Sequence, residues 1–119
     1  MKSSHPFSRS VHHALRGIRL AFLSERSFRL QSVAALFVVF AMLLFPLRLY
    51  ERILLLLLIG SVLVLELINS VFERLVDAFK PRMHPLVKDM KDLMAAAVLV
   101  ASCIAAIVGI LIFSPHIVG

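Results

Sequence analysis

The most regular feature of the sequence is a set of three long apolar stretches separated by short polar segments. A helix that crosses a bilayer needs roughly 20 mostly apolar residues, and each stretch reaches that length once its flanks are included. Backbone polar groups in lipid must be satisfied within the segment itself, which favours helices over open strands. The pattern predicts three membrane-spanning helices, at about 29–48, 52–79 (with a cytoplasmic extension) and 91–113.

The segment before the first span, about residues 7–24, follows a different pattern. Its apolar residues recur every three or four positions, which is the spacing of one helix face. They are Phe7, Val11, Leu15, Ile18 and Phe22. Most of its basic residues fall on other faces, and a basic amphipathic helix of this kind lies in the membrane interface. The expected fold class is therefore an all-α integral membrane protein with three spans preceded by one interfacial helix.

The second span carries a narrow polar stripe. At about 100° per residue, Glu66, Asn69, Glu73 and Asp77 fall within an arc of about 80°. A carboxylate inside the membrane costs about 3 kcal/mol, and such residues usually face a bundle interior and mark function. Oxygen donors suit a hard cation such as Mg²⁺, whereas His and Cys ligands for zinc are missing from the stripe. The alternative is a polar contact that joins the helices of an oligomer.

Composition and charge place this chain in a membrane with a defined orientation. Of its 119 residues, 61% are hydrophobic, and the mean hydropathy is +0.96. Six Lys and Arg residues precede the first span and five lie around the second loop, against two in the first loop and none after the third span. Basic loops stay in the cytoplasm, so the N-terminus is expected there. These segments contain no Trp or Tyr, and Phe7 and Phe22 fall on the apolar face, so anionic headgroups rather than nucleic acid are the expected partner.

Residue patterns alone leave the reaction open. The single cysteine, Cys103, excludes an intrachain disulfide, and no glycine-rich nucleotide loop or hydrolase motif occurs. A small membrane adaptor would also explain a polar stripe. An ion conduit is disfavoured, because it would need ionisable residues through the full depth of the membrane, and the third span carries no charge from Leu93 to Phe113.

Three motifs carry a family resemblance: ELINSVFE at 66–73 followed by Asp77, KDLMAAAV at 91–98, and SERSFR at 24–29. Together with FSR and ALRGIR segments between 7 and 19, they resemble the prokaryotic diacylglycerol kinase family, which includes undecaprenol kinases. The resemblance covers about residues 7–113. It implies an ATP- and Mg²⁺-dependent lipid kinase of the bacterial inner membrane. It also implies a homotrimer whose active sites are composites of neighbouring subunits.

The resemblance implies roles for the carboxylates. Glu66 would be the general base that takes the proton from the lipid hydroxyl, and Asn69 would position the reacting groups. Glu73 and Glu25 would hold Mg²⁺ that bridges the ATP phosphates, and so belong to the ATP site as well. From the residues alone, Glu25 has a simpler explanation as the exposed salt-bridge partner of a nearby arginine.

The resemblance also implies nucleotide and lipid contacts. Lys91 would meet the phosphates, and Asp92 would orient Lys91 or contact the nucleotide. The remaining implied nucleotide contacts are Arg9, His13, Asp77 and His84, and Ala95 would join Glu66 in contacting the lipid. His13 departs from the tyrosine that some members carry at this place. The expected reaction converts diacylglycerol to phosphatidic acid, with undecaprenol as the alternative substrate, because the same residues serve either lipid.

Overall fold

The computed structural model describes residues 6–79 and 85–118. These ranges form four α-helices: α1 (Pro6–Ser24), α2 (Arg26–Leu44), α3 (Leu49–Ala78) and α4 (Pro85–Ile117). The last three are each long and apolar enough to cross a membrane. Within the described ranges, the prediction of an all-helical chain with three membrane spans is confirmed.

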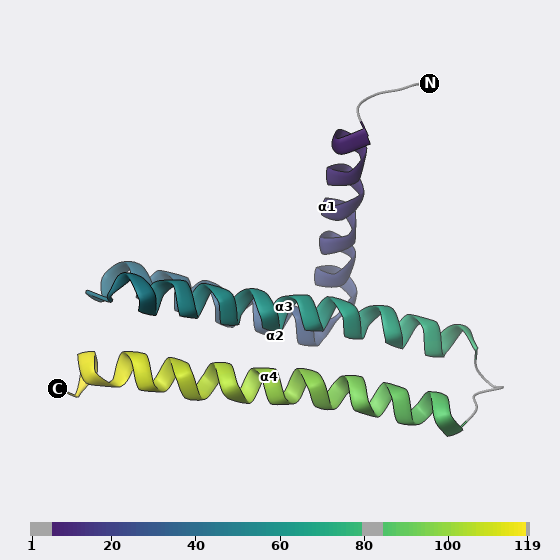
Figure 1. Cartoon of the computed structure of the whole chain (residues 1–119). Helices are drawn as coiled ribbons and strands as arrows, with labels where there is room; N and C mark the ends of the chain where they lie inside the picture. The colour runs from purple at the N-terminus through teal and green to yellow at the C-terminus, as the bar shows by residue number, and fades with distance from the viewer. Residues whose placement is uncertain (1–5, 80–84, 119) are drawn as a thin grey trace.

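The three long helices lie alongside one another, and α1 projects from them, crosswise to their long axes (Figure 1). α3 packs against both α2 and α4, while α1 contacts α2 and α3. Ala21, near the end of α1, is buried in this contact region. Because α3 is the central helix, its polar stripe is positioned to meet side chains from both neighbours and from the α1–α2 junction.

Local chemistry explains where the helices begin and end. The residue before a proline disfavours the helical conformation, so α2 stops at Leu44 and Phe45, which precedes Pro46, is extended. At the start of α3, the backbone N of Arg48 donates a hydrogen bond to Glu51 Oε1 (2.9 Å). Glu25 also has an extended backbone and separates α1 from α2. This break places the Glu25 side chain at the corner between two helices.

Large apolar side chains cover most of the outer surface of the bundle. A small buried cluster holds the end where α2 leads into α3, and it consists of Met42, Leu47, Leu55 and Ile112. Elsewhere, side chains such as Leu36 and Phe37 are exposed. Continuous apolar exposure on this scale is not tolerated in water, so these faces are suited to lipid or to other membrane helices.

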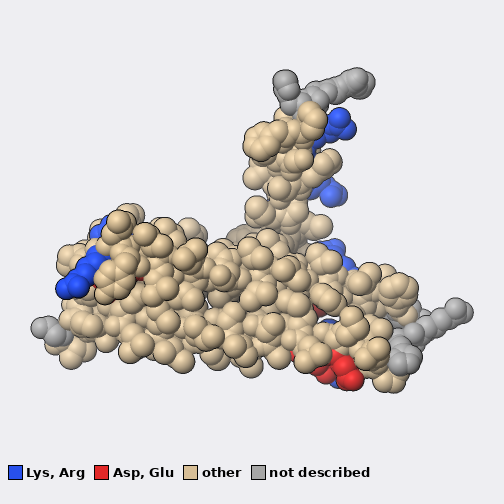
Figure 2. Space-filling view, viewed as in Figure 1, with Lys and Arg blue, Asp and Glu red and all other residues tan. Residues whose placement is uncertain are grey.

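Charged side chains gather at particular parts of the surface (Figure 2). The basic side chains of α1 project on the side that faces the end of α3 and the start of α4, and the opposite side shows no Lys, Arg, Asp or Glu in this view. Exposed acidic side chains, drawn red, lie near the start of α4, which contains Asp89 and Asp92. The charge of α1 thus lies on one side of the helix, and its place in the membrane interface stays a prediction.

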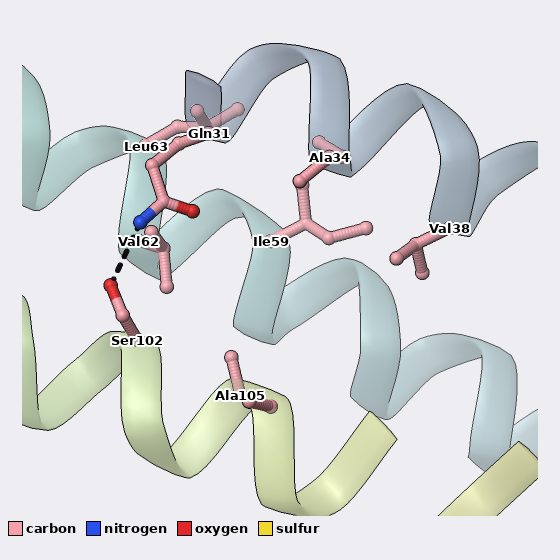
Figure 3. A pocket seen from close by; sticks show the side chains of 10 residues that line it. Gln31, Ala34, Val38, Ile59, Val62, Leu63, Ser102 and Ala105 are labelled. Carbon is pink, nitrogen blue, oxygen red and sulfur yellow. Dashed lines mark hydrogen bonds between the residues drawn. The ribbon is translucent and has the colours of Figure 1, made fainter. Parts of the chain in front are cut away.

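A small apolar cavity of about 190 Å³ lies between α2, α3 and α4 (Figure 3). Gln31 of α2 reaches across it, and its Nε2 donates a hydrogen bond to Ser102 Oγ of α4 (3.0 Å). This bond joins two helices that each pack mainly against α3. It is a polar interhelical contact of the kind that stabilises membrane bundles.

We expect Ser102→Ala to lower the free energy of unfolding by about 0.6 kcal/mol, the average for an interhelical hydrogen bond in a membrane protein. Reversible unfolding by SDS in mixed micelles measures this change. Ser61→Ala is the matched control, because the Ser61 hydroxyl donates within its own helix to the Leu57 carbonyl (2.8 Å). Equal effects of the two substitutions would show that the Gln31–Ser102 bond contributes nothing specific.

Candidate active site

The deepest carboxylate of the stripe, Glu66, is buried between α2 and α3. Only 4% of the residue is exposed. Its Oε2 accepts a hydrogen bond of 2.6 Å from the hydroxyl of Ser27, the second residue of α2. Sequence reasoning did not identify Ser27, because nothing in the pattern along one helix indicates which residue of another helix will face it. The bond links the carboxylate to the α1–α2 corner.

A second pair of carboxylates lies at the same corner. Glu25 precedes α2, and Glu73 lies two helical turns after Glu66 on α3. The side chains of Glu25 and Glu73 lie close enough to interact electrostatically. Two neighbouring carboxylates repel each other when both are charged, so such a pair favours a cation or a proton nearby. The structure therefore brings together, within one chain, the two residues that the resemblance implied as metal ligands.

Arg74 is a further charged residue at this corner. Its Nη2 donates a hydrogen bond to Ser24 Oγ (2.7 Å) and lies 4.0 Å from Glu25 Oε2. The simpler explanation of Glu25, as the partner of Arg26 or Arg29, is not what the structure shows. Arg29 instead donates to the carbonyls of Phe22 and Leu23, at 3.0 and 3.1 Å. Arg74 thus links α3 to the end of α1. The sequence did not indicate this contact, because Arg74 and Ser24 lie 50 residues apart.

Lys91 and Asp77 complete the charged group around Glu73. Both interact electrostatically with Glu73, Lys91 favourably and Asp77 unfavourably. The start of α4 therefore lies close enough to Glu73 for Lys91 to interact with it electrostatically. Asn69 is half-buried on α3 between Glu66 and Glu73. The candidate site is thus assembled from the α1–α2 corner, the second half of α3 and the first turns of α4.

Other predicted residues lie at or outside the margin of this group. Asp92 pairs with Lys88 (2.9 Å), one helical turn earlier. Ala95 is exposed on α4, one turn after Lys91. Arg9 and His13 are exposed on α1, which extends away from the bundle (Figure 1). His84 lies outside the described residues.

The donor set fits a hard divalent cation. In the described part of the chain, no group of three or more His, Cys, Asp and Glu side chains could hold a metal ion. The Glu25–Glu73 pair nevertheless matches what Mg²⁺ uses at phosphate-transfer sites, namely one or two carboxylates together with substrate phosphates and water. The carboxylate contact itself is the observation that supports this fit.

Comparison with known proteins decides the class of this site. The family model for prokaryotic diacylglycerol kinase matches residues 12–113. The chain belongs to the prokaryotic diacylglycerol kinase family. It is therefore a membrane-bound lipid kinase with a lipid substrate, and it uses ATP, typically with a divalent metal. This membership favours the enzyme over the adaptor that the residue pattern left open.

Individual relatives carry two different names. The undecaprenol kinase of Bacillus subtilis (strain 168) is 40% identical over 111 residues, which cover 93% of this chain and 90% of that protein. The diacylglycerol kinase of Haemophilus influenzae is 37% identical, covering 87% of this chain and 90% of the relative. The diacylglycerol kinase of Escherichia coli (strain K12) is 31% identical, covering 87% and 85%. This kinase is thus similar to enzymes named for either lipid.

Proposed function

We propose that this kinase transfers the γ-phosphoryl group of ATP to the primary hydroxyl of a membrane lipid in a Mg²⁺-dependent reaction. The observation that carries the proposal is the buried Glu66 carboxylate, which is hydrogen-bonded to Ser27 of the segment that also holds Glu25, while Glu25 interacts electrostatically with Glu73. Phosphoryl transfer needs a base for the acceptor hydroxyl and a metal ion for the nucleotide phosphates, and the two must lie near each other. The site lies where apolar helices end, so a buried lipid and a water-soluble nucleotide can both reach it.

In the proposed reaction, Glu66 takes the proton from the lipid hydroxyl, and Asn69 positions the reacting groups beside it. Glu25 and Glu73 hold Mg²⁺, which when bound neutralises charge on the phosphates. Lys91 contacts the phosphates. Asp77 and Asp92 contribute to the nucleotide site from α3 and α4. Arg9, His13 and His84 are proposed as further nucleotide contacts, and Ala95 as a lipid contact, on the resemblance to the family.

Orientation and assembly are part of the proposal. We infer a bacterial inner-membrane location with the N-terminus and second loop in the cytoplasm, as the Lys and Arg distribution indicates. The crosswise position of α1 and its basic side toward the α3–α4 end support a helix lying along the cytoplasmic interface. Homotrimerisation is proposed from the family resemblance, and the exposed apolar faces of the bundle are suited to it. Within one chain, Glu25 and Glu73 lie close enough to interact electrostatically, which supports a metal ion held by two residues of the same subunit.

Diacylglycerol is the first proposed substrate, because relatives named diacylglycerol kinase match most of this chain at 31% and 37% identity. Undecaprenol is the second, favoured by the 40% identity to an undecaprenol kinase. Purified protein in mixed micelles, tested with Mg²⁺ and labelled ATP, should phosphorylate diacylglycerol with a higher kcat/KM than undecaprenol. Faster phosphorylation of undecaprenol would replace the first proposal by the second. No transfer to either lipid would contradict both.

A further inference from the structure

The Ser27–Glu66 hydrogen bond singles out one carboxylate oxygen. The two residues lie 39 positions apart in sequence and on different helices, and the O–O distance is 2.6 Å. Oε2 of Glu66 is the atom that accepts this bond. Because a hydroxyl donates a single hydrogen, Ser27 bonds one of the two carboxylate oxygens, and Oε1 takes no part in this bond. The two carboxylate oxygens are therefore not equivalent, because only Oε2 is bonded to Ser27.

Ser27 also lies close in sequence to a proposed metal ligand. It lies two residues after Glu25, in the first turn of α2. The same short segment therefore supplies a proposed metal ligand and the hydrogen-bond donor to the proposed base. A rigid helix start fixes the relative placement of the two groups, and phosphoryl transfer depends mainly on such placement.

We propose that Ser27 is a positioning residue, whose hydroxyl fixes the Glu66 carboxylate so that Oε1 faces the lipid hydroxyl. This inference rests on the proposed role of Glu66 as the base. The glutamate side chain has three rotatable bonds, and a carboxylate free to turn spends less time in the reactive arrangement. Losing the bond therefore lowers the rate of the chemical step, while ATP and lipid still bind.

The test compares Ser27→Ala with Ser102→Ala in steady-state kinetics of the full chain in mixed micelles, with the better lipid substrate. We expect Ser27→Ala to lower kcat about tenfold, as the loss of a hydrogen bond to a charged group predicts. The KM values for ATP and lipid should change less than about twofold. Ser102→Ala removes an interhelical hydrogen bond of the same kind, away from Glu66, and should leave kcat unchanged.

A second pair of variants separates catalysis from packing. Thr and Val have nearly the same shape, but only Thr retains the hydroxyl, so Ser27→Thr should keep most of kcat and Ser27→Val should lose it. Equal kcat values for the Thr and Val variants, or equal losses in Ser27→Ala and Ser102→Ala, would overturn the positioning role. A wild-type protein that transfers phosphate to neither lipid would instead overturn the proposed function itself.

Discussion

Glu66→Gln is expected to lower turnover by about 10²- to 10⁴-fold, the range attributed to general acid–base catalysis. The amide keeps the shape of the side chain but accepts protons poorly, so the lipid hydroxyl would have to lose its proton without help. Glu66 is 4% exposed and is held by Ser27, so water has little access to replace it. The KM for ATP should change little, because the nucleotide is bound by other residues. Initial rates with labelled ATP and excess lipid measure both quantities.

Glu51→Gln is the matched control for this experiment. It makes the same chemical change on the same helix, at the end far from the candidate site. Glu51 Oε1 accepts the hydrogen bond from the backbone of Arg48, so the variant should lose at most about 1 kcal/mol of stability and keep its turnover. If Glu66→Gln retained near-normal turnover, Glu66 would not be the base and the inference about Ser27 would fail with it.

Glu25→Gln and Glu73→Gln should each raise the Mg²⁺ concentration needed for half-maximal activity by about 10- to 100-fold or more. Changes that only disturb a metal ligand already have effects of this size, and these substitutions remove a charged ligand itself. Titration of activity against Mg²⁺ at fixed ATP measures the shift. The double variant should be little worse than the worse single variant, because contacting residues that serve one ion do not act independently.

Asp89→Asn provides a control at the same end of the bundle. Asp89 is an exposed acid on α4, three residues before Asp92 and outside the proposed metal pair. Its removal lowers the negative charge of the region by the same amount, so a general electrostatic effect would appear in all three variants. Unchanged metal dependence in both glutamate variants would remove the shared metal site from the proposal.

The fold was predictable because its main signals are local. Length and hydropathy of a segment indicate a spanning helix without reference to any other segment, since lipid imposes the same requirement on each helix separately. Helix periodicity likewise placed Glu66, Asn69, Glu73 and Asp77 on one face of α3. The roles of these residues came from the family motifs, because carboxylates on one face identify an oxygen-rich site but no reaction.

Contacts between helices lay beyond reach of the sequence patterns. The resemblance implied that Asp92 orients Lys91 or contacts the nucleotide. In the structure Asp92 pairs with Lys88, one turn earlier on the same helix, and its role toward the nucleotide stays a prediction. Neighbours in sequence suggested that Glu25 would pair with Arg26 or Arg29, whereas the corner between α1 and α2 turns Glu25 toward Arg74. For Glu25, the direction of the backbone at the corner therefore mattered more than proximity along the chain.

The sequence by itself determined that this is a three-span helical protein with a carboxylate stripe on its second span, because these properties depend on residues within one helix. Only the tertiary structure identified Ser27 as the partner of Glu66, and it also showed Glu25 near Glu73, a pairing that the family resemblance had implied. The packing of α2 against α3 brings Ser27 to Glu66 and Glu25 to Glu73, across 39 and 48 residues of sequence. Such pairings depend on the angle and register between helices, and no periodicity within a single helix encodes them.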